Sequence, residues 1–548
     1  MNKFFKYILP AAVLMLASSS LVSCTGDLDV TPLDPSLQTV DSIQPEQLFN
    51  KCYACLAVAG NGGANGDSDV DGIDGGTSGY FRQVWNANEL TTDEAICSWG
   101  DDGIPQFNYD TYDAGHPMLQ GLYYRLYTTI VFCNDYIDKF ADYNATMTAE
   151  VRFLRALTYY YLLDGWGNVN MVTSASDAGR QVAREELFQY VEQELLEVEP
   201  LLDAPEARSK ANAKWGRVDK DAARLLLARL YLNAQVYTGE ARWADAANYA
   251  KQVMDGPHKL NTQGVDCTVD GLSHYFTPYQ MLFMGDNDVT SASSEAILPL
   301  LQDGLRTTSW GTALFLIAST WDADMHENPF DETATNGTSE AWGGNRARPD
   351  LVRLFFPRND APSSSKGYNT AVAAGDDRAL FNTDGRTLEV ETPTTFKSGY
   401  AVAKFTNFKT DNSIGSHSQF PDADVFFMRT AEAYLTYAEA LTRQNGGNAP
   451  AEAVNAINAV RERANASTRN VYTLDEILDE WGREFYFEGR RRIDLVRFGQ
   501  FGGPQATYTW AWKGGVAEGR NFPATRNIFA IPTNDLIANP SLVQNPGY

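Results

Sequence analysis

The stretch EWGREFYFEGRRRIDLVRFG (480–499) decides the fold, because it combines a helical apolar pattern with the densest basic run of the chain. Apolar residues recur at helical spacing from Leu474 to Phe485, and Gly489 suits the C-terminal end of that helix. The basic run 489–497 has acidic neighbours, Glu484, Glu488 and Asp494. We therefore expect these charges to pair inside the fold rather than to bind an acidic partner.

Helical periodicity extends on both sides of this stretch. Residues 223–234 and 243–254 form two short amphipathic patterns separated by a turn, and residues 431–441 and 453–464 form a second pair. Residues 152–167 are apolar nearly all round, as in a buried helix. The paired helices resemble tetratricopeptide units, although the full consensus is not met. The sequence predicts an all-α frame over about 120–255 and 425–490.

The long segment between these helices, about 256–420, has a different composition. Clusters of Gly, Asn, Asp and Pro separate short strand-like runs. A segment of this length is too long to be an idle loop, so we expect it to carry function. The helical pairs on both sides favour one domain, 41–548, over separate domains along the chain.

The first residues have the three parts of an export signal. Two lysines precede an apolar run, Tyr7 to Ala17, which is shorter than the ~20 residues that span a bilayer. Leu21-Val22-Ser23-Cys24 then resembles a bacterial lipobox. We predict a lipoprotein signal peptide over 1–23, lipidation at Cys24 and a polar tether over 24–40. The alternative is an ordinary secretory signal with an incidental Cys24.

Composition disfavours nucleic-acid binding, a disulfide framework and a histidine-based metal site. The chain of 548 residues has 44 basic and 70 acidic residues and a formal net charge of −26, which disfavours nucleic-acid binding. Five scattered cysteines remain after Cys24, too few and unevenly spaced for a disulfide framework, and we interpret them as buried apolar residues. Five isolated histidines disfavour a histidine-based metal site.

The sequence contains no recognisable catalytic constellation. DSDVDGIDGG (67–76) imitates the start of an EF-hand, but Ser78 stands where the bidentate Glu is required, so we expect a polar loop. Nucleophile-elbow, zincin and phosphate-loop motifs are absent from the sequence. Three tryptophans, Trp99, Trp310 and Trp342, stand in loop-like surroundings. An indole left in a loop can pack internally or offer its face to a sugar ring.

Several motifs together resemble the SusD/RagB family of Bacteroidetes over essentially the whole chain. They are the lipobox, EVRFLRALTYYYLLDGWG (150–167), KDAARLLLARLYLNAQVYTG (220–239), RTAEAYLTYAEAL (429–441), the opening stretch and IFAIPTNDLIANPSLVQNPGY (528–548). The resemblance implies a surface-exposed outer-membrane lipoprotein without enzymatic activity. It also implies a SusD-like fold with a tetratricopeptide-type frame and a SusC-like TonB-dependent transporter as partner.

The likeness is strongest to the starch-binding branch of the family. It implies that the tryptophans form an arc for starch or malto-oligosaccharides, with Arg82 and Asp102 bonding sugar hydroxyls. This chain departs from that branch at three positions. Cys97 stands where the branch has a tryptophan, Asp102 where it has an asparagine-like partner, and Trp310 where it has a tyrosine. These departures leave the arc usable but leave the exact substrate open.

The same resemblance implies a structural calcium ion, and no cofactor for catalysis. The acidic segments 284–290 and 421–429 match those that hold calcium in the starch-binding branch, and carboxylates are ligands that calcium prefers. Solvated loop carboxylates are the alternative. The four candidate ligands are Asp286, Asp288, Asp422 and Asp424.

Three other functions remain open at this point. A SusD-like chain could bind another glycan or a peptide. An extracellular glycoside hydrolase would need two carboxylates about 5 to 10 Å apart, and a chain with 70 acidic residues has such pairs by chance. A protein-binding scaffold would leave Trp99, Trp310 and Trp342 scattered or buried.

Overall fold

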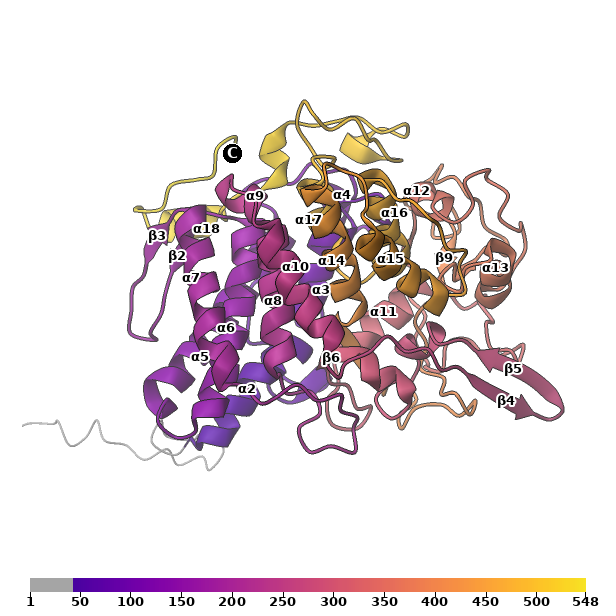
Figure 1. The fold of residues 1–548 in the computed structure, drawn as a ribbon, viewed down its shortest axis with the longest axis horizontal. Coiled ribbons are helices and arrows are strands. Elements are labelled where there is room, and N and C mark those ends of the chain that lie inside the picture. Colours follow the sequence, from indigo (N-terminus) through magenta and orange to yellow (C-terminus); the bar gives the residue numbers. More distant parts are fainter. Residues whose placement is uncertain (1–42) are drawn as a thin grey trace, which may run out of the picture. The chain divides into compact units, whose positions relative to one another are not determined.

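A computed structural model describes residues 43–548 (Figure 1). The chain divides into two units, Met1–Leu48 and Phe49–Tyr548, and almost all of the described structure belongs to the second. The predicted signal peptide, the tether and Cys24 lie outside the described residues. Among those residues, none of the helices is long and apolar enough to cross a membrane.

Helices dominate the fold, as the sequence predicted. In the first half they are α2 (Pro45–Ala57), α3 (Tyr80–Glu89), α4 (Ile104–Asn108), α5 (Pro117–Phe140), α6 (Ala145–Gly165), α7 (Arg184–Val198), α8 (Lys220–Leu232), α9 (Ala234–Thr238) and α10 (Trp243–Asp255). In the second half they are α11 (Ala313–Thr320), α12 (Pro349–Arg353), α13 (Gly367–Ala374), α14 (Ala431–Gln444), α15 (Ala451–Arg463), α16 (Leu474–Phe485), α17 (Arg491–Arg497) and α18 (Thr533–Ala538).

The predicted helix pairs are present and pack against one another. Helix α10 packs on α8, α14 packs on α15, and α10 also packs on α14, which joins the two parts of the frame (Figure 1). Small residues face these contacts, because Ala246, Ala250 and Ala438 are fully buried. Helix α6 is buried almost all round, as its apolar pattern predicted. The match of these pairs to the tetratricopeptide repeat stays a prediction.

The strands are short and form two-stranded antiparallel sheets. The hairpins β2–β3 (Val169–Met171 and Arg180–Val182), β4–β5 (Val265–Val269 and Leu272–Phe276) and β8–β9 (Phe381–Asn382 and Ala401–Val402) are local. Two other pairs join distant segments: β6 (Ala296–Leu300) with β10 (Val425–Arg429), and β1 (Ala95–Cys97) with β7 (Asn345–Ala347). The segment 256–420 is therefore connected to the frame by strand pairing.

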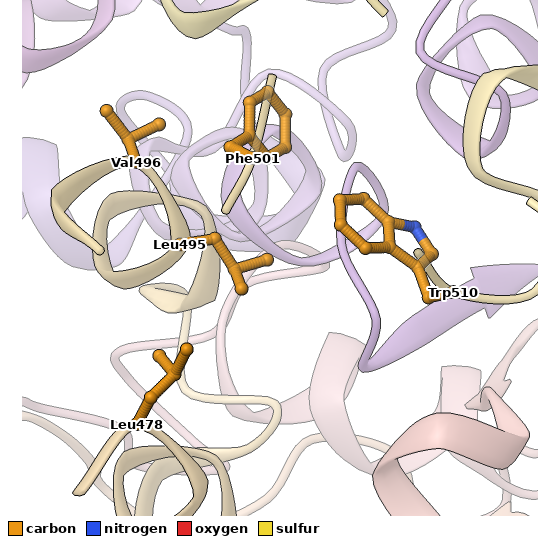
Figure 2. Close-up of a cluster of buried hydrophobic side chains, with 5 residues drawn as sticks. All are labelled: Leu478, Leu495, Val496, Phe501 and Trp510. Atoms are coloured by element: carbon orange, nitrogen blue, oxygen red, sulfur yellow. The ribbon is translucent and has the colours of Figure 1, made fainter. Parts of the chain in front are cut away.

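The stretch 480–499 contributes to a buried apolar cluster together with residues on both sides of it. Leu478 of α16, Leu495 and Val496 of α17, Phe501 and Trp510 form one buried apolar cluster (Figure 2). Helix α16 ends at Phe485, four residues before the predicted end at Gly489. The chain turns at Phe487, whose φ is +64°, and Gly489, whose φ is +82°, then precedes α17. Gly489 therefore lies in the connection between α16 and α17 and does not end α16.

The basic run pairs internally, as predicted, but mostly with partners distant in sequence. Arg491 contacts Asp93 at 2.7 Å and Arg492 contacts Asp164 at 2.9 Å. Of the predicted acidic neighbours, Asp494 does accept hydrogen bonds from arginines of the run. Glu484 and Glu488 instead face the arginines and lysine of other segments.

The five cysteines within the described residues are free and buried, as the sequence predicted. Cys52 and Cys55 lie on α2, and burial raises the pKa of Cys55 to about 12. A thiol of such high pKa carries almost no thiolate at neutral pH, which disfavours nucleophilic chemistry at Cys55.

Candidate glycan-facing site

The pairing of β1 with β7 brings Trp99 and Trp342 together. Cys97 lies opposite Asn345, and beyond that pair the Ser98 amide donates a hydrogen bond to the Gly344 carbonyl at 3.0 Å. Trp99 follows directly, and its indole Nε1 donates to the Trp342 carbonyl at 3.4 Å. Two loops 243 residues apart are therefore held in register by three strand residues on each side.

Two glycines make room for the indoles. A Cβ atom on Gly344 would lie 2.2 Å from the ring of Trp99, and one on Gly76 would lie 2.8 Å from the Cβ of Trp310. Real Cβ atoms do not approach heavy atoms this closely, so only glycine allows the backbone to pass beside each ring.

Trp342 lies between the other two tryptophans. Its ring centroid is 6.2 Å from that of Trp99, with 54° between the planes, and 6.2 Å from that of Trp310, with 36° between the planes. All three side chains are half-buried. Because each ring is tilted relative to its neighbour, the three do not form a flat wall.

Hydrogen bonds and packing fix the orientation of each ring. Trp342 Nε1 donates to Glu340 Oε2 at 2.6 Å, and Trp310 Nε1 donates to the Ala64 carbonyl at 3.0 Å. Trp310 and Trp342 rest on a small buried cluster that includes Leu314, and Trp310 also contacts Phe420 edge-on at 5.1 Å. The rings are pre-organised because their indole N–H groups are already satisfied by the protein.

The tryptophans line a cavity of about 620 Å³. Its other walls come from the segment 59–77, from α3 and from the loop that precedes α11. This volume falls in the ordinary range for small-molecule sites, about 300–1,000 Å³. Besides the three tryptophans, the side chains that give it polarity are those of Asp74, Thr77, Arg82, Asp101 and Ser309.

Arg82 lies beside the aromatic surface, as the resemblance implied. Its guanidinium carbon is 5.8 Å from the centroid of the Trp99 ring, and Nη1 donates to the Gly76 carbonyl at 3.4 Å. Within residues 43–548, its Nε has no hydrogen-bond partner. Burial lowers the pKa of Arg82 to about 10, so the group is charged at neutral pH and can donate to an oxygen-rich ligand.

Asp102 is exposed and does not line the cavity, whereas its neighbour Asp101 does. The two residues stand side by side in one loop, and the sequence contains no periodicity that would show which one faces inward. The role assigned to Asp102 stays a prediction. Cys97, where the starch-binding branch has a tryptophan, is buried in β1 and adds no surface to the cavity.

Sequence reasoning did not assign a role to the segment 59–77. It expected only a polar loop over 67–76, whereas the segment supplies Asp74, Thr77 and several glycines to the cavity wall. Asp74 Oδ1 accepts hydrogen bonds from the amide and hydroxyl of Thr77, which closes the turn against Trp310. Four aspartates and seven glycines between 60 and 76 were the available signal.

The four candidate calcium ligands do not converge on one point. Among the described residues, no group of three or more His, Cys, Asp or Glu side chains is placed to hold a metal ion. Asp424 accepts Trp215 Nε1 at 2.8 Å and the Gln302 amide at 2.6 Å. Asp288 faces Lys210 Nζ at 2.7 Å.

The remaining two candidates also have protein partners. Asp286 accepts the Thr410 hydroxyl at 2.6 Å, and Asp422 accepts the Gly304 amide at 3.1 Å and faces Lys409 Nζ at 3.2 Å. These arrangements do not fit a calcium ion without rearrangement. The calcium prediction stays a prediction.

Known proteins resemble this chain at the level of sequence and of fold. The model of the SusD family matches residues 368–548. The starch-binding protein SusD of Bacteroides thetaiotaomicron is 37% identical over 586 aligned residues, which cover 100% of both chains.

Solved structures show the same fold at low identity. Surface glycan-binding protein A of Bacteroides thetaiotaomicron, in complex with laminarihexaose, covers 91% of this chain and 98% of its own, with a TM-score of 0.61 and 19% identity. A laminarin-binding SusD-like protein covers 92% and 99%, with a TM-score of 0.63 and 20% identity. On the full-length identity to SusD, this chain belongs to the SusD family, whose members are binding proteins and not enzymes.

Proposed function

We propose that this chain binds starch or malto-oligosaccharides on the surface formed by Trp99, Trp310 and Trp342. The observation that carries the proposal is that these rings line one cavity with successive tilts of 36° and 54°. An α-1,4-linked glucan coils, so consecutive glucose rings can each rest on a differently tilted indole.

The chemistry of the lining supports a neutral, hydroxyl-rich ligand. An indole offers a large apolar face that covers the apolar face of a sugar ring, and the polar groups at its edge can bond hydroxyls. Arg82 and Asp101 lie at that edge. The affinity expected for such stacking is micromolar to millimolar, about −8 to −4 kcal/mol.

The similar proteins support a glucan as the ligand and favour one glucan over another. The relative that is 37% identical is named as starch-binding, whereas the relatives whose names mention laminarin share only about a fifth of their residues with this chain. Starch is therefore the first candidate and laminarin, which is also a curved glucan, is the second. A hydrolase is disfavoured because the family consists of binding proteins.

We further propose that the lipid on Cys24 holds the protein at the outer face of the outer membrane, beside a SusC-like TonB-dependent transporter. Capture next to the pore would raise the effective concentration of oligosaccharide there, since a binding protein tethered beside the transporter holds its ligand close to the pore. Co-purification of a TonB-dependent transporter with the tagged chain from native membranes tests this partner, and its absence from stoichiometric preparations would oppose it.

Calorimetric titration tests the glycan. Maltoheptaose and laminarihexaose are titrated into the purified protein, with an inulin oligosaccharide as the control ligand. We expect heat with maltoheptaose, little with inulin, and a large fall in affinity in Trp99→Ala and Trp342→Ala. The matched control is Trp243→Ala, a half-buried tryptophan on α10 that does not line the cavity.

The pattern of results decides between the candidates. Heat with laminarihexaose alone keeps the site and replaces starch with laminarin. Equal affinity of Trp342→Ala and the unaltered protein rejects the tryptophan surface as the site. An assay for reducing ends in the same mixtures addresses hydrolysis, because a binding protein releases none.

A further inference from the structure

A second and larger cavity lies elsewhere in residues 49–548, with a volume of about 1050 Å³. Its walls come from the β4–β5 hairpin, from α13 and from α14 and α15. It shares no lining residue with the tryptophan cavity. Figure 1 shows the β4–β5 hairpin projecting from the body of this unit, on the same side as α13.

Three tyrosines contribute to this cavity from three different elements: Tyr275 from β5, Tyr368 from α13 and Tyr434 from α14. Tyr275 is 49% exposed, and the other two are half-buried. Among the described residues, none of the three phenol hydroxyls has a hydrogen-bond partner. Each ring therefore presents an apolar face together with a polar group that is free to bond a ligand.

The aromatic wall is partly ordered by its own packing. The rings of His274 and Tyr368 lie edge to face, with centroids 5.1 Å apart and 71° between planes. His274 in turn contacts Phe276 at 4.8 Å, which anchors the hairpin end of the wall. Burial lowers the pKa of His274, so the imidazole is neutral and adds no positive charge to the cavity at neutral pH.

The charges that line this cavity disfavour an anionic ligand. The guanidinium of Arg463 is already paired with Glu295 at 2.7 Å and with Glu484. Lys259 Nζ donates to the Met254 carbonyl at 2.7 Å. A phosphate or nucleotide would therefore meet one exposed cation, Lys259, against the carboxylates of Asp377 and Glu462 that also line the cavity.

The remaining polar groups suit hydroxyls. The carboxylates of Asp377 and Glu462 line the cavity beside the amides of Asn369 and Asn465. Asn465 bonds the Asp377 carboxylate, and the Asp377 amide donates to the Ala464 carbonyl at 2.8 Å, which fixes this edge to the end of α15. Carboxylates and amides beside tyrosine faces combine the two kinds of contact that a sugar ring can make.

We propose that this cavity is a second binding site for a neutral oligosaccharide. The inference rests on the proposed function only for the class of ligand, since the two cavities are built from different residues. A long glucan that occupied both sites would bind more tightly than either site alone, because the second contact is made at high effective concentration.

The test removes the first site before it probes the second. Maltoheptaose and laminarihexaose are titrated into the Trp99→Ala/Trp342→Ala protein, and then into the same protein with Tyr275→Ala or Tyr434→Ala added. Residual binding should be in the millimolar range and fall about tenfold with each tyrosine substitution. The matched control is Leu272→Ala, an exposed residue of the same hairpin that does not line the cavity.

Each outcome bears on one proposal or both. Two outcomes overturn the second site and leave the proposed function standing. In the first, Tyr275→Ala and Tyr434→Ala leave the residual binding unchanged. In the second, the double tryptophan variant binds nothing while the intact protein binds. Full affinity in the double tryptophan variant, lost with the tyrosines, supports this cavity and rejects the tryptophan surface. An intact protein that binds neither probe overturns both proposals. Tyr275 is exposed, so its variant is expected to fold, and its unfolding midpoint is checked first.

Discussion

Gly344 and Trp99 are in such close contact that a Cβ atom on the glycine would lie 2.2 Å from the indole. The backbone at this point is fixed, because the Ser98 amide bonds the Gly344 carbonyl at 3.0 Å. In Gly344→Ala the indole must therefore move while the strand pair stays. We expect affinity for maltoheptaose to fall by up to about tenfold, since an aromatic contact contributes about 0.5–1.5 kcal/mol.

The neighbouring Gly100 provides the matched control for this prediction. A Cβ on Gly100 would meet no atom within 4 Å, so Gly100→Ala should leave affinity unchanged. Titration calorimetry measures both variants, and thermal unfolding confirms that they are folded. Unchanged affinity in a folded Gly344→Ala protein would show that Trp99 does not contact the glycan.

Glu484 stabilises the fold through a buried ion-pair network. Arg429 contacts its Oε1 at 2.6 Å, and Arg463 and Arg378 also contact its carboxylate. Burial alone would raise the pKa of Glu484, but these guanidinium groups lower it to about 2. We expect Glu484→Gln to destabilise the protein by about 3–5 kcal/mol, because it leaves buried arginine charges uncompensated.

Urea unfolding at neutral pH measures this loss. Glu452→Gln, an exposed glutamate on α15, is the control and should change stability by less than about 0.5 kcal/mol. A Glu484→Gln protein as stable as that control would mean that the network contributes nothing. Since the pKa of Glu484 is lowered, its contribution is present above pH ~4.5 and is lost as the pH falls through about 2.

The sequence predicts a helix or strand well only where the element is long enough to show several repeats of its apolar pattern. Helices α8, α10, α14 and α15 follow their apolar patterns because each has three turns or more of one buried face. The pairing of β1 with β7 was not predictable in this way. Three residues on each strand give no alternation to count, and the partners are 250 residues apart.

The candidate site shows the same limit. Family resemblance placed Trp99, Trp310 and Trp342 in one site, and the structure brings them together. Of the two neighbouring aspartates, both exposed, Asp101 lines the cavity and Asp102 does not, and no sequence pattern distinguishes them. The end of α16 was predicted wrongly for a related reason: Phe487 takes a left-handed conformation that its residue type does not predict.

A third prediction concerns calcium. Lys210 Nζ lies 2.7 Å from Asp288 Oδ2 and so supplies a positive charge beside the Asp288 carboxylate. We expect that addition of EDTA or of excess CaCl₂ leaves the thermal unfolding midpoint unchanged. A midpoint that rises with calcium and falls with chelator would instead support a cation among Asp286, Asp288, Asp422 and Asp424, because a ligand that binds only the native state stabilises it. Addition of MgCl₂ is the control for ionic strength.

The last prediction concerns pH and rests on Asp110, which is buried at the end of the turn after α4. Burial raises the pKa of its carboxyl to about 8, against the opposing influence of Arg348 and Lys513. A carboxyl with a raised pKa contributes stability that is fully present below its ordinary pKa of about 4 and is lost as the pH rises through about 8. Asp110→Asn removes this titration. Its φ of +54° is a conformation that asparagine also adopts readily, so the turn is kept.

We therefore expect the Asp110→Asn protein to gain stability relative to the unaltered protein as the pH rises from about 4 to about 8. Urea unfolding at unit pH intervals gives the two stability curves, and each unit of pKa difference corresponds to about 1.4 kcal/mol. Asp142→Asn, at an exposed position, is the control and should run parallel to the unaltered protein. A group that titrates differently in the folded and unfolded states must change the slope of stability with pH. If the curve of Asp110→Asn also ran parallel to that of the unaltered protein, the buried carboxyl would therefore not bind a proton in this range.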